Sequence, residues 1–145
     1  MSALTSDRST PARDGRLLPQ PVAASAVIHA GGLAALNATG YAHGGAFAAS
    51  DTVIGRAEQA MDNTGGADGA KSLIVGRHQV YRFDIATGDP VTQADVGKTV
   101  FAVDDINIAR TDGANPSATP AVAASRPAAG KLVGVDADGA WVDIA

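Results

Sequence analysis

Apolar residues occur along this chain in short runs separated by turn residues, which is the pattern of an all-β protein. The longest run spans residues 71–85. Its odd-numbered positions, including Leu73 and Tyr81, are largely apolar and its even-numbered positions are largely polar or small, so the run predicts a half-buried strand. Arg77 and Gln79 interrupt the apolar face, which indicates either a bulge or the point at which the strand leaves the core.

The end of the chain, residues 129–143, has the pattern of one complete β-hairpin. Alternating apolar residues flank Asp138 and Gly139, and this pair favours a tight turn because glycine adopts positive φ without steric cost. The only tryptophan, Trp141, follows shortly after the turn. The chain is therefore expected to end in a sheet.

The remaining apolar runs are shorter, and turn residues set their ends. A second hairpin is expected around Asp104 and Asp105. Residues 92–97, which begin with a capping threonine, predict one short helical segment that Gly97 can stop. Prolines exclude a helix from the alanine-rich stretch 111–128, which is expected to be a loop. One further strand region is expected from residues 27–28 through Gly31 and Gly32 to Leu33 and Leu36, and another opens at residues 53–54 and continues through Arg56 towards Met61. The strands of the second hairpin are expected at residues 100–103 and 106–109.

A glycine follows two large aliphatic residues at three places, Gly55, Gly76 and Gly134. Within a strand such a glycine marks a bend or a close approach of two backbones, as at the corner of a small barrel. The expected fold is therefore all-β: a small compact β-barrel or sandwich with one short helical turn and an extended N-terminal arm.

The arm is residues 1–25, which differ in composition from the β-rich domain expected at 26–145. Serine, threonine and proline dominate this segment, and Pro11, Pro19 and Pro21 prevent a continuous helix. Fully extended, such an arm could span roughly 80 Å, enough to cross a neighbouring subunit. A disordered tail is the alternative interpretation.

Composition indicates a thin hydrophobic core. Apolar residues make up 46% of the chain, but alanine supplies much of that share and aromatic residues only 4%. Chains that bury little apolar area on their own are commonly stabilised by oligomerisation or by docking on a larger surface. Either is expected here.

Charge and cysteine content exclude several classes of protein. The net charge of −4 is mild and the basic residues form no patch with interleaved aromatics, so nucleic-acid binding is not expected. The absence of cysteine excludes disulfides and thiol chemistry. No secretory signal and no membrane-spanning apolar run is recognisable, so a soluble protein without membrane contact is expected.

Few residues suggest catalysis or metal binding. Asp136, Asp138 and the following glycine resemble the start of a calcium loop, but no later glutamate completes it and a hairpin turn is favoured. Asp104 and Asp105 are adjacent, so on a strand their carboxylates would point to opposite faces, and a turn is again favoured. The three histidines, at 29, 43 and 78, lack ligand spacing and are expected at surface or edge positions. No cofactor, no metal and no enzymatic activity is expected.

The stretches at residues 30–42, 54–67 and 91–98, together with the terminal hairpin, resemble small structural proteins from tailed-bacteriophage heads, the capsid decoration or cement proteins. The resemblance runs in the same order over residues 27–145. It implies a compact β domain bound in many copies to the outside of the assembled shell, stabilising it against internal DNA pressure without catalysis. The sequence departs from the family in its long arm and in the loop at residues 115–126.

Five residues of the arm are the candidate binding site. They combine adaptable positive charge with the arm's only adjacent pair of large apolar side chains. Their expected partners are the major capsid protein and neighbouring copies of this chain, on the outer surface of the virion. The alternative interpretation is that the arginines are merely solvated. The five residues are Arg8, Arg13, Arg16, Leu17 and Leu18.

Two other functions are alternatives to capsid decoration: a surface-binding domain and a small hydrolase. A virion surface domain could bind carbohydrate or a host surface through loops 62–70 and 111–128, although few aromatic residues are available to stack on a sugar. A small β-barrel hydrolase would need clustered carboxylates with shifted pKa values in a cleft.

Overall fold

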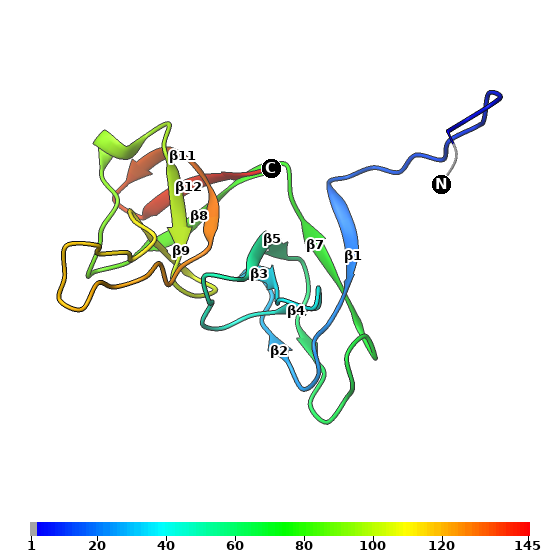
Figure 1. Ribbon diagram of the computed structural model, residues 1–145, viewed down its shortest axis with the longest axis horizontal. Helices are drawn as coiled ribbons and strands as arrows, with labels where there is room; N and C mark the ends of the chain where they lie inside the picture. The colour runs from blue at the N-terminus through cyan, green and yellow to red at the C-terminus, as the bar shows by residue number, and fades with distance from the viewer. Residues whose placement is uncertain (1–2) are drawn as a thin grey trace.

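A closed five-stranded barrel forms the C-terminal part of the fold, in the order β10-β8-β12-β11-β9 (Figure 1). The computed structural model describes residues 3–145, and it confirms the all-β class, the compact barrel and the single short helical turn. The barrel strands are β8 (Gln79–Ile85), β9 (Thr99–Ala102), β10 (Asn107–Ala109), β11 (Ala128–Asp136) and β12 (Gly139–Ile144).

The predicted terminal hairpin is β11 and β12, but its turn is one residue earlier than expected, at Ala137 and Asp138, because Gly139 is already the first residue of β12. The two strands pair in antiparallel register from Lys131 opposite Asp143 to Asp136 opposite Gly139, with an irregularity between Leu132 and Gly134. The Asp104–Asp105 hairpin is also confirmed, because β9 and β10 pair in antiparallel register on either side of that turn.

The N-terminal part of the domain is an open five-stranded sheet, called the first sheet below, in the order β1-β7-β5-β3-β4, beside a separate two-stranded pair. Val22, just after β1, forms a parallel bridge to Ala42 in β4, so the two edges of the sheet approach each other. The sheet strands are β1 (Leu17–Pro21), β3 (Leu33–Leu36), β4 (Ala42–His43), β5 (Thr52–Ala57) and β7 (Ser72–Gly76), and the pair is β2 (Val27–Ile28) with β6 (Met61–Asp62).

Strand β3 lies between two hydrophobic cores and contributes to both. Leu33 and Ala35 pack in the barrel core with residues such as Phe83, whereas Ala34 packs in a second core with Val22. Successive side chains of a strand point to opposite faces, so one strand with Leu33, Ala34 and Ala35 buried can serve both cores. This arrangement joins the sheet to the barrel.

The expectation of one strand over residues 71–85 is wrong in one respect. The chain forms two strands, β7 in the sheet and β8 in the barrel, and it passes from one to the other at Arg77 and His78. His78 has φ of 58° and donates its backbone N–H to Ile144 in the barrel at 2.6 Å. The interruption in the apolar face is therefore the point at which the chain leaves one core for the other.

Part of the expected arm belongs to the sheet. Residues 17–21 form β1, which pairs with β7 from Leu17 opposite Gly76 to Pro21 opposite Ser72, and Val22 is fully buried. The pairing partner lies far along the chain, so no local pattern near residue 17 indicates it. The segment that projects from the domain is consequently shorter than residues 1–25.

Gly55 and Gly76 confirm the expected close approach of two backbones. Gly55 has φ of 151°, and a Cβ atom there would collide with the carbonyl oxygen of Gly76 on the neighbouring strand β7. Gly134 differs, because a Cβ atom there would meet nothing within 4 Å. It lies at the irregularity in β11 instead.

The helical turn and the long loop also follow the sequence expectation. The turn is a 3-10 helix at Gln93–Asp95, and the Asp95 carboxylate accepts the backbone N–H of Thr92 at 2.8 Å. Residues 111–127 contain no strand apart from an isolated bridge between Asn115 and Val122. Among residues 3–145, no helix has the length and apolar character needed to cross a membrane.

Candidate functional site

Residues 3–14 run away from both sheets as an extended arm (Figure 1), and their side chains are exposed. Arg8 and Arg13 lie on this arm, and neither forms an ion pair or a hydrogen bond with another residue in the described range 3–145. Their guanidinium groups are directed to solvent. Leu4, which the sequence analysis did not select, is also on the arm and is 71% exposed.

The root of the arm is attached at the point where β7 passes into β8. The side-chain Nε of Arg77 donates to the carbonyl oxygen of Gly15 at 2.9 Å. The backbone N–H of Arg77 donates to the carbonyl oxygen of Arg16, also at 2.9 Å. These two hydrogen bonds hold the root of the arm at Gly15 and Arg16 against the domain.

Arg16 has only a weak local partner. Its Nε lies 3.8 Å from the Asp14 carboxylate, and both side chains are more than half exposed. Such surface pairs contribute little to stability, because water and salt screen them. Arg16 can therefore exchange Asp14 for another anion at low cost.

Leu17 and Leu18 lie in β1, at the edge of the sheet. Leu17 is 57% exposed, whereas Leu18 is half-buried opposite Val75. The fold brings Arg16 and the two leucines together beside the root, but Arg8 and Arg13 lie further out along the arm. The five predicted residues thus form two groups.

The outer edge of β1 has few free backbone donors. The backbone N–H of Arg77 donates to the carbonyl oxygen of Arg16, and that of Val22 donates to Lys71. The backbone N–H and C=O groups of even-numbered residues in β1 therefore point toward β7, and those of odd-numbered residues point outward. Two of the outward positions are Pro19 and Pro21, which have no N–H group. Proline at such positions protects a sheet edge from pairing with another strand. Contacts of this edge with a partner would therefore depend on side chains.

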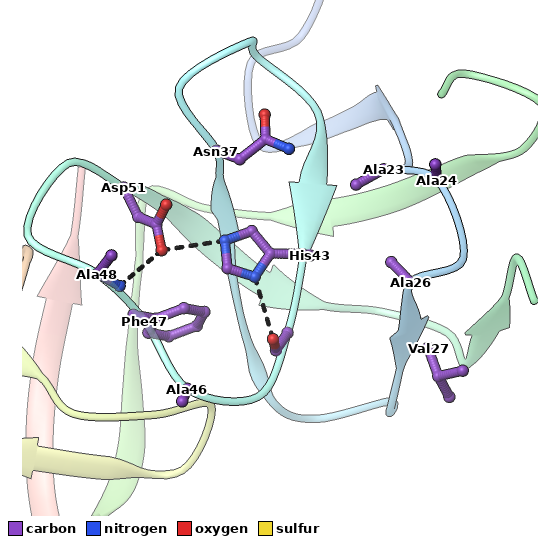
Figure 2. A pocket seen from close by; sticks show the side chains of 11 residues that line it. Ala23, Ala24, Ala26, Val27, Asn37, His43, Ala46, Phe47, Ala48 and Asp51 are labelled. Atoms are coloured by element: carbon purple, nitrogen blue, oxygen red, sulfur yellow. Dashed lines mark hydrogen bonds and ion pairs between the residues drawn. The ribbon is translucent and has the colours of Figure 1, made fainter. Parts of the chain in front are cut away.

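A concave site lies beside β4, with a volume of about 580 Å³ (Figure 2). His43 stands in its wall: its Nε2 is 3.0 Å from the Asp51 carboxylate and its Nδ1 is 3.1 Å from the carbonyl oxygen of Gly44. The same carboxylate accepts the backbone N–H of Ala48 at 2.8 Å. The ring of Phe47 meets the His43 ring edge-on at 5.5 Å between centroids. The sequence analysis missed the His43–Asp51 pair because a loop separates the two residues.

This arrangement clamps the loop between β4 and β5, because Asp51 bonds both His43 and Ala48. Both ring nitrogens of His43 lie within hydrogen-bond distance of oxygen atoms of the same chain, so both are already engaged within the loop. The polar side chains among the residues lining the hollow are Asn37, His43 and Asp51. Small residues form most of the remaining wall, chiefly Ala23, Ala24, Ala26, Ala46 and Ala48.

The carboxylates considered in the sequence analysis are engaged in turns. Asp136 accepts the N–H groups of Asp138 and Gly139 and the indole N–H of Trp141, and these bonds, that of Trp141 foremost, hold its pKa below the ordinary value. Burial opposes ionisation of Asp104, but hydrogen bonds from Asn107 and the turn backbone outweigh it and lower its pKa. Within residues 3–145, no three histidine, cysteine, aspartate or glutamate side chains gather as a metal site would require.

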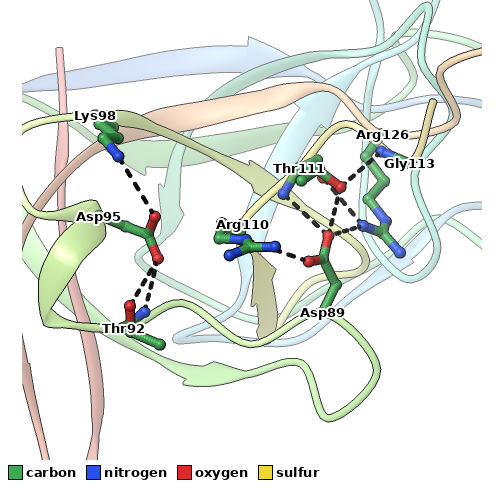
Figure 3. Close-up of polar contacts among 8 residues, drawn as sticks. All are labelled: Asp89, Thr92, Asp95, Lys98, Arg110, Thr111, Gly113 and Arg126. Atoms are coloured by element: carbon green, nitrogen blue, oxygen red, sulfur yellow. Dashed lines mark hydrogen bonds and ion pairs between the residues drawn. The ribbon is translucent and has the colours of Figure 1, made fainter. Parts of the chain in front are cut away.

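Asp89 anchors the long loop at residues 111–127 (Figure 3). Its Oδ2 accepts the backbone N–H and the hydroxyl of Thr111 and an N–H of Arg126 at 2.9 Å, while Arg110 lies 3.8 Å from Oδ1. Partial burial raises the pKa of Asp89, but the bonds from Thr111 and Arg126 outweigh that effect and hold it below the ordinary value. Both ends of the loop are thereby fixed to the segment that follows β8.

In comparisons with protein families, with curated proteins and with solved structures, no match to this chain is found. Its function is therefore inferred from its own residues and geometry.

Proposed function

We propose that this chain is a non-enzymatic structural protein of a tailed-phage head. It binds the outer surface of the assembled shell and stabilises contacts between major capsid subunits. Its partners are the major capsid protein and neighbouring copies of itself.

The observation that carries the proposal is the arm at residues 3–14. Its side chains are exposed and its root is held by Arg77, so the arm extends from a fixed point of the domain. Arg8 and Arg13 are without ion-pair partners in the described part of the chain, and their forked guanidinium groups suit carboxylates on another subunit. An arm with these properties is adapted to binding something outside its own domain.

Multivalency makes weak contacts of this kind sufficient. Once the domain is docked on one subunit, binding of the arm to the next becomes intramolecular and benefits from a high effective concentration. Leu17 supports the contact of the arm with the second subunit, because it presents an exposed apolar side chain beside the root. Arm and domain together would then bridge two subunits.

Co-sedimentation tests the proposal. Purified full-length protein is mixed with expanded phage heads that lack it, and saturable binding at a fixed ratio to the major capsid protein is expected. The absence of binding would overturn the proposal.

A truncated variant separates the arm from the domain. The deletion should remove residues 1–14 only, because Leu17–Pro21 form β1 and Val22 belongs to the second core. This variant is expected to fold and to occupy the shell far less than the full chain. Equal occupancy would reject the arm contact while leaving the decoration role intact. A matched control replaces Arg110, an exposed arginine outside the arm, with glutamine.

The alternative of carbohydrate binding through loops 62–70 and 111–128 has less support. Neither loop contains an aromatic residue, so neither offers a ring on which a sugar could stack.

A further inference from the structure

The outer wall of the barrel carries an exposed aromatic residue that the decoration role does not use. Trp141 lies in the middle of β12 and is 37% exposed, whereas Ala140 and Val142 on either side are fully buried. Its neighbours across the sheet are Arg82 on β8 and Gly134 on β11. Residues directly opposite each other in a sheet share a face, so these two positions flank the indole.

The indole ring is held in a defined orientation. Its Nε1 donates to the Asp136 carboxylate at 2.7 Å, and the Arg82 guanidinium carbon lies 5.8 Å from the ring centre. On the other side Gly134 contributes no side chain, and a Cβ atom there would meet nothing within 4 Å. Trp141 is therefore a rigid ring with open space beside it, which reduces the entropy lost when a ligand stacks on it.

A groove of about 380 Å³ lies next to Trp141, within the size range of small-molecule sites. It lies where the barrel meets the first sheet. The lining residues are Gly31, Arg56, Val80, Tyr81, Arg82 and Trp141.

Two guanidinium groups line this groove, and both offer hydrogen-bond donors only. Arg56 lies 4.4 Å from the centre of the Tyr81 ring and is fixed by Glu58, which accepts from its Nε and Nη2. Arg82 is held more loosely, 3.8 Å from an Asp138 carboxylate that is 74% exposed. A ligand must therefore supply acceptors, and a carboxylate can replace Asp138 at Arg82 with little loss.

We propose that this groove binds an acidic saccharide. The apolar C–H face of the sugar ring stacks on Trp141, its carboxylate pairs with Arg82, and its hydroxyl oxygens accept from Arg56. Each of these groups lies on a strand, so the backbone positions that carry the site are fixed before the ligand arrives. No residue of the arm at residues 3–14 lines the groove, so the site would add a recognition function to shell binding.

Trp141 itself provides the measurement, because it is the only tryptophan and gives a single indole N–H signal in ¹H–¹⁵N spectra. The full-length protein is titrated with glucuronate, with glucose and with acetate under the same conditions. Glucuronate is expected to shift the indole signal saturably, with an affinity on the order of millimolar, and glucose to shift it less. Acetate tests for a general effect of anions.

Two variants make the test specific. Arg82→Gln and Val80→Glu should each weaken glucuronate binding at least about tenfold, the first by removing the cation and the second by adding a negative charge to the groove. Val80 is 42% exposed, so the fold should tolerate the change. Arg110→Gln is the matched control, since Arg110 is similarly exposed and also lies 3.8 Å from an aspartate, but outside the groove.

A saturable shift with glucuronate that both variants weaken and Arg110→Gln does not weaken supports the proposal. An unmoved indole signal, an equal response to acetate, or an unchanged response in both folded variants would overturn it.

Discussion

The Nε of Arg77 lies 2.9 Å from the carbonyl oxygen of Gly15, and this bond attaches the arm to the point where the chain passes from the first sheet into the barrel. The half-buried position of Arg77 limits competition from water. The root of the arm is thus positioned by a residue far away in the sequence.

Replacing Arg77 with alanine should loosen the root of the arm without unfolding the domain. The variant loses the bond to Gly15 but keeps the backbone bond to Arg16, so the loss of stability should be about 1 kcal/mol. Hydrogen exchange should become faster at residues 15–18 and remain unchanged in the barrel. Unchanged exchange at the root would contradict the anchoring role.

Replacing Gly55 with alanine should destabilise the first sheet strongly. The residue has φ of 151°, and the added Cβ would collide with the carbonyl oxygen of Gly76, so a cost of about 1–3 kcal/mol is expected. Urea denaturation measures this change. Gly134→Ala serves as the control and should be nearly neutral, because its Cβ meets no atom within 4 Å.

Replacing Asp89 with asparagine should release the long loop at neutral pH. The charge-assisted bonds to Thr111 and Arg126 weaken, and a loss of about 1–3 kcal/mol is expected. Because the pKa of Asp89 is lower in the folded than in the unfolded chain, its stabilising contribution is present above the unfolded value and is lost as the pH falls through the folded value.

The stability difference between wild type and Asp89→Asn should therefore shrink below roughly pH 4. Denaturation curves recorded at neutral and acid pH check this. A difference that stays constant over that range would show that the charge of Asp89 is not the cause. Asp138→Asn, at a highly exposed aspartate, should change little at either pH.

Replacing Asp51 with alanine should open the loop between β4 and β5. Its carboxylate is largely buried and holds both the His43 ring and the Ala48 N–H, so the variant leaves two donors without their acceptor. Faster hydrogen exchange at Ala48 and a changed environment of the His43 ring in NMR spectra are expected. Protection of the Ala48 amide equal to that of the wild type would contradict the clamp.

Local features of the fold could be predicted from the sequence because their causes lie within a few residues. The turn residues of the terminal hairpin, those of the Asp104–Asp105 hairpin and the prolines of the loop at residues 111–127 each act on adjacent backbone, although the terminal turn is one residue earlier than expected. The exposed positions of Arg8 and Arg13 also follow from the polar composition around them. The sequence also indicates an interruption of the apolar pattern at Arg77, but it does not distinguish a bulge from the passage of the chain between two sheets.

The sequence by itself determined the β class, the main turns and the exposed outer arm, since these depend on side-chain periodicity and backbone preference. Only the tertiary structure decided that residues 17–21 join the first sheet, that β3 serves two cores, that His43 meets Asp51, and that Trp141 stands between Arg82 and Gly134. The physical reason is that strand pairing joins segments remote in the chain, so the partner of each side chain depends on sheet register and order.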